Sequence, residues 1–198
     1  MRLARTLADR DDGFFDLRCD VTVPDEVSRA IGCVLERVGV PRIVVNNAGA
    51  FLLKPLVDTT PEEFQQQLAV NVVAPFLVTR ALLPHLVRVG EGHIVTIGSI
   101  ADHQAFRGNA AYGASKYGLR GLHEVLAAEV AGTGIRTSLV SPGPTDTRLW
   151  DPIDPDRRDD LPQRADMLQP EDVADAVLFV VTRPHRAMID LLRVSPKR

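Results

Sequence analysis

Hydrophobic positions along this chain follow two alternating patterns. Short, nearly continuous apolar runs are typical of strands buried in a parallel sheet, and longer stretches with an apolar residue every three or four positions are typical of helices. The short runs predict strands at Phe14–Val21, Ile43–Asn46, Gly92–Gly98, Ile135–Ser141 and Ile189–Val194. The longer stretches predict helices from Pro24 to about Val38, from Thr60 onward, from Ala110 to about Val130 and from Pro170 onward.

Residues with special backbone preferences mark the ends of these elements. Thr22 is predicted to be the N-cap of the first helix, with Pro24 in its first turn and Gly39 as its stop. Thr60 is followed by a proline and two glutamates, which is a typical helix start. Residues 148–169 are rich in Pro, Asp and Arg and predict a mobile loop.

The alternation of strands and helices predicts an α/β fold. We expect a Rossmann-like, doubly wound parallel sheet with helices on both faces, formed by residues 1–198 as a single domain. Ligands in such folds gather at the carboxyl ends of the strands. Polar or glycine-containing clusters follow several predicted strands here, namely Asp20-Val21, Asn46–Gly49, Ser99 and Pro142–Thr147. The functional site is therefore expected at this edge of the sheet.

The composition is that of an ordinary globular protein. Hydrophobic residues make up 45% and charged residues 25% of the 198 positions, and the formal net charge is −3. No run of Lys or Arg predicts binding to nucleic acid or to an anionic membrane. The apolar stretches are interrupted by charges or proline too early to span a bilayer, and the first residues lack the apolar core of a secretory signal. We therefore expect a cytoplasmic protein without membrane or nucleic-acid partners.

Cysteines and histidines show no pattern typical of a disulfide framework or a metal site. Cys19 and Cys33 are expected to be small buried hydrophobic residues in a reducing compartment. The histidines lack metal-ligand spacing, so no metal site is expected. They are His85, His93, His103, His123 and His185.

One pair of residues suggests acid/base chemistry. Tyr112 and Lys116 lie four positions apart on a predicted helix and therefore share a face. A free tyrosine has a pKa of about 10, and a nearby ammonium favours the phenolate. Lowering that pKa by about 3 units requires about 4 kcal/mol of differential stabilisation. By itself, however, such a pair is more often an ordinary surface pair on a helix.

Two further polar residues have both a structural and a functional interpretation. Ser99 follows a predicted strand, where a serine is usually a cap, but its hydroxyl could also hydrogen bond a substrate carbonyl or alkoxide. Asn71 lies within a long apolar helix, either as a tolerated polar residue or as the holder of a water in a proton relay.

Taken together, the motifs resemble those of the short-chain dehydrogenase/reductase family. Each is common alone, but the set is specific in this order and spacing, and the resemblance runs from about residue 12 to the C-terminus. The motifs are Asn46-Asn47-Ala48-Gly49, Asn71, Ser99, Tyr112-Gly113-Ala114-Ser115-Lys116 and Ser141-Pro142-Gly143-Pro144-Thr145-Asp146-Thr147.

The resemblance implies an NAD(P)-dependent oxidoreductase that interconverts an alcohol and a carbonyl group of a small molecule by hydride transfer. Tyr112 would be the general acid/base, and Lys116 would lower its pKa and bind the nicotinamide ribose. Ser99 would orient the substrate oxygen, and Asn71 would support a water relay. The family also implies a homo-dimer or homo-tetramer, and its reaction requires no metal.

The resemblance assigns further residues to the cofactor, NAD or NADP. Asp20 and Val21 would meet the adenine. The remaining positions would be Asn47, Ala48 and Gly49 on the adenosine side, and Pro142, Gly143, Thr145 and Thr147 beside the nicotinamide and its phosphates. The residue that normally selects between the two cofactors ends a strand without counterpart in these 198 residues, so the choice stays open.

The chain departs from the family at its start. Members begin with a strand, a glycine-rich turn (Thr-Gly-x-x-x-Gly-x-Gly), a helix and a second strand, and the 198 residues contain no such turn. We expect an incomplete sheet that lacks this strand–helix–strand unit, with the strand Phe14–Val21 loosely placed or paired elsewhere. Met1–Asp9 would be the exit of the second strand or the helix after it. Either the true start lies upstream and Met1 is internal, or the chain is a catalytically silent remnant that at most associates with other subunits.

Two further segments bear on the substrate. The C-terminus lacks the Thr-Gly…Asp-Gly-Gly segment of relatives that act on acyl-carrier-protein substrates, and looks more like that of relatives acting on small hydroxy acids or other alcohols. The loop 148–169 would cover the substrate. Arginines there, among them Arg157, Arg158 and Arg164, could bind a carboxylate or belong to a solvated loop.

Overall fold

The computed structural model describes residues 2–4 and 15–197. Its main sheet has four parallel strands in the order β3-β4-β5-β6. These are β3 (Ile43–Asn46), β4 (Gly92–Ile97), β5 (Ile135–Pro142) and β6 (Leu191–Val194). The apolar runs predict all of them, although β6 begins at Leu191 rather than Ile189.

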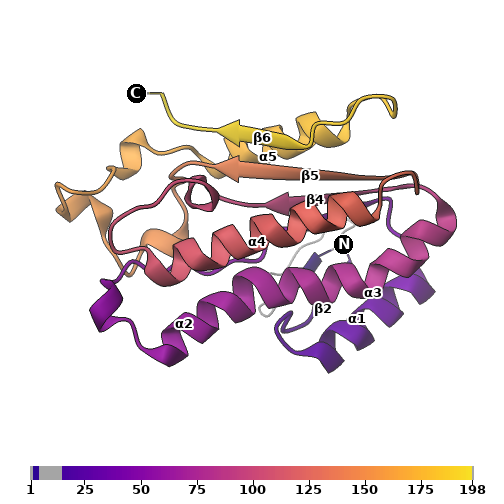
Figure 1. Ribbon diagram of the computed structural model, residues 1–198, viewed down its shortest axis with the longest axis horizontal. Coiled ribbons are helices and arrows are strands. Elements are labelled where there is room, and N and C mark those ends of the chain that lie inside the picture. The colour runs from indigo at the N-terminus through magenta and orange to yellow at the C-terminus, as the bar shows by residue number, and fades with distance from the viewer. Residues whose placement is uncertain (1, 5–14, 198) are drawn as a thin grey trace.

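Helices cover both faces of this sheet, as the alternating pattern predicts (Figure 1). Because side chains alternate along a strand, Ile94 packs in a core cluster with α1, α3 and α4, whereas its neighbour Val95 packs in a second cluster with α5. The helices are α1 (Pro24–Arg37), α2 (Pro61–Leu68), α3 (Ala74–Val89), α4 (Ala110–Glu129) and α5 (Pro170–Val181).

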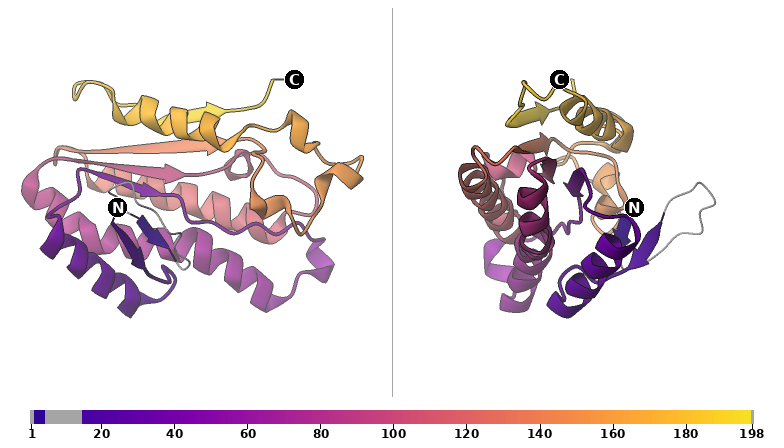
Figure 2. Two further views of the ribbon diagram at one scale, coloured as in Figure 1. Left: turned by 180° about the vertical axis from the view of Figure 1, so that it is seen from behind. Right: turned by 90° about the vertical axis from the view of Figure 1, so that its right-hand side faces the viewer.

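The N-terminal strands form a separate two-stranded sheet (Figure 2). β1 (Arg2–Ala4) pairs in parallel with β2 (Asp16–Arg18). The predicted strand Phe14–Val21 is therefore shorter than expected, and Phe14 itself lies outside the described residues. As expected for an incomplete sheet, this strand pairs elsewhere and not within the main sheet. The predicted identity of Met1–Asp9 is testable only at Arg2–Ala4, which is a strand; the rest lies outside the described residues.

The outer edge of β3 is bare within the described part of the chain. β3 pairs with β4 on one side only. Ile43 and Val45 are 48% and 43% exposed, although both belong to an apolar run. An unpaired edge and exposed apolar side chains both cost stability, which is the expected consequence of a sheet without its first strands.

The helix starts are only partly as predicted. The N-cap of α1 is Val23 and not Thr22, so that prediction was wrong. Locally, Thr22 belongs to a turn before the helix, in which its N–H and its hydroxyl both donate to Asp20 Oδ1, at 3.0 Å and 2.7 Å. Thr60, in contrast, caps α2 as expected. Its Oγ1 accepts from the Glu63 N–H at 3.2 Å, and the Glu63 carboxylate accepts from the Thr60 N–H at 2.8 Å.

The second predicted helix is longer and less regular than its sequence suggests. It runs without a break through α2, a π-helical turn (Ala69–Val73) and α3. This Pro61–Val89 helix is long and apolar enough, by length and composition, to cross a membrane. We expected the apolar stretches to be interrupted earlier, but Pro84 is accommodated inside the helix. In the fold the helix contacts α4, α1 and β4, and 28% of its most apolar window is buried.

Two smaller expectations are corrected by burial and local structure. Cys19 is buried in the first core cluster as expected, but Cys33 is only half-buried, because it lines an open pocket between α1 and β2. The predicted loop 148–169 contains short 3₁₀ turns: Arg148–Trp150, Pro155–Arg157 and Arg164–Asp166.

Candidate active site

A cavity of about 1270 Å³ lies at the carboxyl ends of β3, β4 and β5. This is the edge of the sheet where the polar clusters were expected to meet. The predicted site residues in its wall are Asn47, Gly49, Ser99, Tyr112, Lys116, Pro142, Gly143, Thr145 and Thr147. The volume exceeds the range of about 300–1,000 Å³ that is usual for a single small-molecule site, so the cavity has room for two ligands.

Tyr112 and Lys116 lie in the first turns of α4 and face the cavity together. The ammonium of Lys116 is 5.7 Å from the centroid of the Tyr112 ring. It also donates to the carbonyl oxygen of Ile97 at 3.1 Å, which anchors the start of α4 to the end of β4. The pair is therefore not an exposed surface pair, because Lys116 is 6% exposed.

Ser99 reaches the same wall from the end of β4. It is the N-cap of a 3₁₀ turn (Ile100–Asp102), and its Oγ accepts from the Ala101 N–H at 3.1 Å. The capping interpretation of Ser99 is therefore correct. Its side chain also lines the cavity and influences the pKa of Tyr112, so the capping role does not remove it from the site.

Burial moves the pKa values of the tyrosine and the lysine in opposite directions. The apolar surroundings raise the pKa of Tyr112; the nearby Ser99 side chain opposes this rise and the charge of Asp102 adds to it. Burial lowers the pKa of Lys116 to about 8, against the opposing charge of Asp102. In each case burial shifts the pKa in the direction that favours the uncharged form, because a charge loses its hydration in this cavity.

Asn71 lies in the π-helical turn and is fully buried. Its side chain accepts from the Ala50 N–H at 2.8 Å and donates to the Ala50 carbonyl at 2.9 Å and to Ser115 Oγ at 2.9 Å. It therefore fixes the loop after β3 to the helix and to α4. A π-helical turn is often found at a functional site, because it redirects one side chain out of the regular helical row.

Comparison with known proteins shows the family to which the chain belongs. A family model described as enoyl-(acyl carrier protein) reductase matches residues 1–189. The 2-(R)-hydroxypropyl-CoM dehydrogenase of Xanthobacter autotrophicus is 38% identical over 178 residues, which cover 85% of this chain and 71% of that protein. The chain belongs to the short-chain dehydrogenase/reductase family.

Solved structures agree with this assignment. The serine dehydrogenase of Escherichia coli has a TM-score of 0.79 at 27% identity, over 92% of this chain and 76% of its own. A metagenomic short-chain oxidoreductase in complex with NADP has a TM-score of 0.76 at 31% identity, over 93% of this chain and 74% of its own. This short-chain dehydrogenase/reductase is thus part of a family of NAD(P)-dependent oxidoreductases.

Most of the residues expected to hold the nicotinamide half of the cofactor lie in the wall of one cavity. Lys116, Pro142–Thr145 and Thr147 line it together with Asn47 and Gly49. The expected contacts at Asp20 and Val21 are not part of this wall, because β2 belongs to the separate sheet and Val21 packs on the first core cluster. The exposed Ala48 does not line the cavity either.

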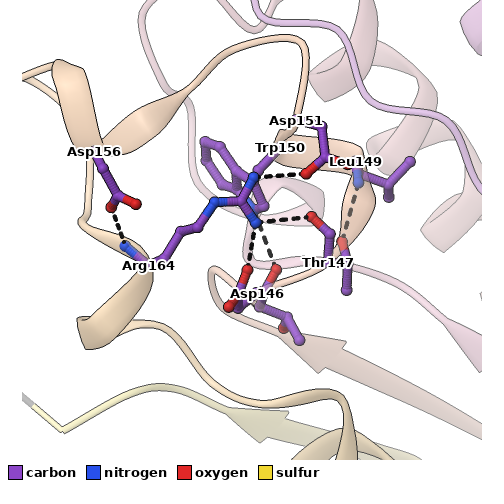
Figure 3. Close-up of polar contacts among 8 residues, drawn as sticks. Asp146, Thr147, Leu149, Trp150, Asp151, Asp156 and Arg164 are labelled. Atoms are coloured by element: carbon purple, nitrogen blue, oxygen red, sulfur yellow. Dashed lines mark hydrogen bonds and ion pairs between the residues drawn. The ribbon is translucent and has the colours of Figure 1, made fainter.

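The loop over the cavity is held by its own ion pairs (Figure 3). Arg164 bonds Asp146 Oδ1 at 2.5 Å and Asp151 Oδ1 at 2.8 Å. Arg157 and Arg158 pair with neighbouring aspartates of the same loop, at 3.0 Å and 2.7 Å. These three arginines are therefore engaged in ion pairs, which disfavours the interpretation that they bind a substrate carboxylate.

Two groups of site residues have no role in the sequence-based prediction. The centroid of the Phe51 ring lies 4.8 Å from that of Tyr112 and 4.9 Å from that of Trp150. The three rings form an aromatic wall of the cavity. Only its place just after the Asn46–Gly49 motif could have drawn attention to it. Asp102 lies beneath Ser99, and its signal was the Ser-x-x-Asp spacing of a capping box.

Proposed function

We propose that this member of the family interconverts an alcohol and a carbonyl group, with Tyr112 as general acid/base. The observation that carries the proposal is that Ser99, Tyr112 and Lys116 line the same cavity, with the Ser99 side chain close enough to Tyr112 to influence its pKa. Two hydroxyl groups that face one cavity can both hydrogen bond a single substrate oxygen, which suits a carbonyl or an alcohol.

In carbonyl reduction, Tyr112 donates its proton to the substrate oxygen. Its raised pKa keeps the phenol protonated at neutral pH until that oxygen becomes negative. Ser99 donates a second hydrogen bond and fixes the position of the oxygen. The chemistry that NAD(P) supplies when bound is hydride transfer to or from the substrate carbon.

Lys116 supports both the tyrosine and the cofactor. With a pKa of about 8 it is mostly protonated at neutral pH, and its ammonium stabilises a phenolate on Tyr112. One of its three N–H donors is used by the carbonyl of Ile97, so two remain for ribose hydroxyls and water. Asn71 fixes the cofactor loop after β3, and its part in a water relay stays a proposal.

The expected partners and location also stay proposals. They are a small-molecule substrate, a homo-dimer or homo-tetramer, a cytoplasmic location, and no nucleic acid or membrane. Apolar side chains on the outer helices support association between copies, since Phe76 of α3 is 43% exposed and Val125 of α4 is 56% exposed.

The second candidate is a catalytically silent chain that acts, if at all, through subunit association. It is favoured by the separate β1–β2 sheet, which leaves the outer edge of β3 unpaired among the described residues. The two candidates differ in whether Tyr112 turns over a substrate.

The test follows reduced-nicotinamide absorbance with a panel of ketones, and with an enoyl thioester because of the description of the matching family model. The 198-residue chain and the chain extended by any in-frame upstream residues are both assayed. Tyr112→Phe keeps the ring but removes the transferable proton, so turnover should fall by about 10²–10⁴-fold while cofactor binding survives.

Lys116→Ala should impair both turnover and cofactor binding, and Tyr117→Phe, an exposed tyrosine of the same helix, is the matched control with unchanged turnover. Near-normal turnover of Tyr112→Phe would show that the acid/base is misassigned. Inactivity of both forms of the chain towards the whole panel would favour the silent chain.

A further inference from the structure

A buried carboxylate lies under the proposed catalytic residues and has no part in the mechanism above. Asp102 is 1% exposed and is the last residue of the 3₁₀ turn that Ser99 caps. Aspartate is almost never fully buried without partners, because its charge loses hydration. Its partners therefore indicate what it does.

The partners of Asp102 belong to the ends of two neighbouring strands. Oδ2 accepts from the Ser99 N–H at 3.2 Å and from the Ser141 hydroxyl at 2.5 Å. Oδ1 lies 2.6 Å from Nδ1 of His103, which must be the donor because a carboxylate only accepts. One side chain thus joins the end of β4, at Ser99, to the end of β5, just before the cofactor-side residues that begin at Pro142.

Because Gly98 has no side chain, it leaves room for the carboxylate of Asp102. A Cβ atom at Gly98 would lie 2.5 Å from Asp102 Oδ2 and 2.9 Å from Ser141 Oγ, which is closer than real contacts allow. The end of β4 therefore needs glycine next to Ser99 as long as Asp102 and Ser141 meet there. Gly98, Ser99 and Asp102 form one local arrangement.

The charge of Asp102 also reaches the tyrosine and the lysine. It raises the pKa of Lys116 and of Tyr112, in both cases as a smaller influence than burial. The other charged groups that line the cavity are Lys54, Arg107, Arg158 and Asp160. Lys54 is paired with Glu63, and Arg158 is paired with Asp160. Arg107 is exposed, so water screens it.

We propose that Asp102 is a positioning residue of this site: it holds Ser99 against the end of β5 and supplies a fixed negative charge to the Tyr112–Lys116 pair. The catalytic meaning of this role rests on the proposed function. The geometric and electrostatic role does not, and it can be measured without turnover.

The chain contains only three lysines, Lys54, Lys116 and Lys197, so the Cε resonances of all three can be resolved by NMR and followed with pH. Asp102→Asn removes the charge at nearly constant shape. The midpoint for Lys116 should fall from about 8 by about one further pH unit, because a neighbouring opposite charge typically shifts a pKa by one unit or more.

Asp175→Asn makes the same change in net charge on the exposed face of α5 and should leave the midpoint where it is. An unchanged Lys116 midpoint in folded Asp102→Asn would overturn the proposal. If Asn at this position prevents folding, the Lys116 midpoint is measured in Asp102→Ser instead, since a serine can still accept from the Ser99 N–H. An unchanged midpoint there would overturn the proposal in the same way.

A kinetic readout separates positioning from general destabilisation. In a form of the protein that turns over, Asp102→Asn should lower kcat while the KM for the cofactor changes little, because Asp102 is not part of the cavity wall. Equal losses in both parameters would contradict a specific role. A missing activity in every variant would affect the proposed function alone, because the Lys116 titration does not depend on it.

Discussion

At the scale of single residues, burial decides which protonation states this fold tolerates. His93 on β4 is 2% exposed, and its Nε2 lies 2.8 Å from Ser138 Oγ. The Ser138 hydroxyl itself donates to the carbonyl of Ile189 at 2.5 Å, so Nε2 must carry the hydrogen of the His93 contact. Nδ1 is buried without a partner among the described residues. Burial, helped by the charge of Arg136, lowers the pKa of His93 to about 4.

This shift predicts a loss of stability in mild acid. The unfolded chain binds a proton at His93 near pH 6.5, whereas the folded chain resists it until about pH 4. The stabilisation is therefore complete above pH 6.5 and is lost as the pH falls towards 4, at up to about 1.4 kcal/mol per pH unit. Thermal or urea unfolding at several pH values in this window measures the slope.

His93→Gln keeps a side-chain donor for Ser138 but cannot titrate, so its unfolding free energy should fall less steeply with acid. His185→Gln, at an exposed histidine, is the control and should match the unmutated protein. Identical slopes for all three proteins would show that the fold does not lower the pKa of His93.

At the scale of elements, two glycine turns meet at the amino ends of the strands. α3 ends at Gly90, whose φ is +72°, and Gly134, with φ +83°, lies just before β5. A Cβ atom at Gly134 would lie 2.0 Å from the carbonyl oxygen of Gly90. The close approach of these turns sets how α3 and β5 join the sheet.

A matched pair of substitutions isolates this close approach. Gly132 also has a positive φ, +78°, but nothing lies within 4 Å of its Cβ position. Gly132→Ala should cost only the left-handed backbone strain, about 1–2 kcal/mol of unfolding free energy. Gly134→Ala should cost clearly more, because the backbone of Gly90 must also move. Urea unfolding measures both, and equal losses would show that the two turns are free to separate.

The long helix that contains Asn71 shows how an irregular element supports the site. Its π-helical turn is centred on Asn71, and the extra residue in that turn lets the side chain bind Ala50 and Ser115 at once. In a regular α-helix the Asn71 side chain would point in a different direction, so the loop after β3 would lose this anchor. The hydrophobic period alone gives no sign of the π turn.

At the scale of the whole molecule, cofactor affinity depends on what binds the pyrophosphate. The described cavity offers contacts at Asn47, Gly49, Lys116 and Pro142–Thr147, but the usual amide cradle of a glycine-rich turn is not in the 198 residues. Without two or three charge-assisted hydrogen bonds, at about 1.5–3 kcal/mol each, a micromolar site becomes roughly millimolar or weaker.

Calorimetric titration of the 198-residue chain with NADH and NADPH measures this directly. We expect weak binding of both, and stronger binding if in-frame upstream residues supply a glycine-rich turn. Micromolar affinity of the 198-residue chain would show that another group takes the place of the turn, and it would remove the main argument for a silent chain.

The sequence by itself determined the parallel sheet, the helices that cover it and the predicted catalytic set. Hydrophobic periods report which face of each element is buried, and the order of the motifs around Ser99, Tyr112 and Lys116 is specific to one family. It also predicted that the strand before Asp20 would be loosely placed or paired elsewhere, and β2 pairs with β1 outside the main sheet.

Only the tertiary structure decided how the site is held. Asp102, Phe51 and the π turn at Asn71 act through contacts between residues far apart in the chain, and these depend on distances that no local pattern records. The same holds for Asp20 and Val21, whose expected cofactor contacts require a neighbouring strand to point them at the cavity. Burial is likewise a property of the folded chain, and it sets the directions in which the pKa values of Tyr112 and Lys116 move.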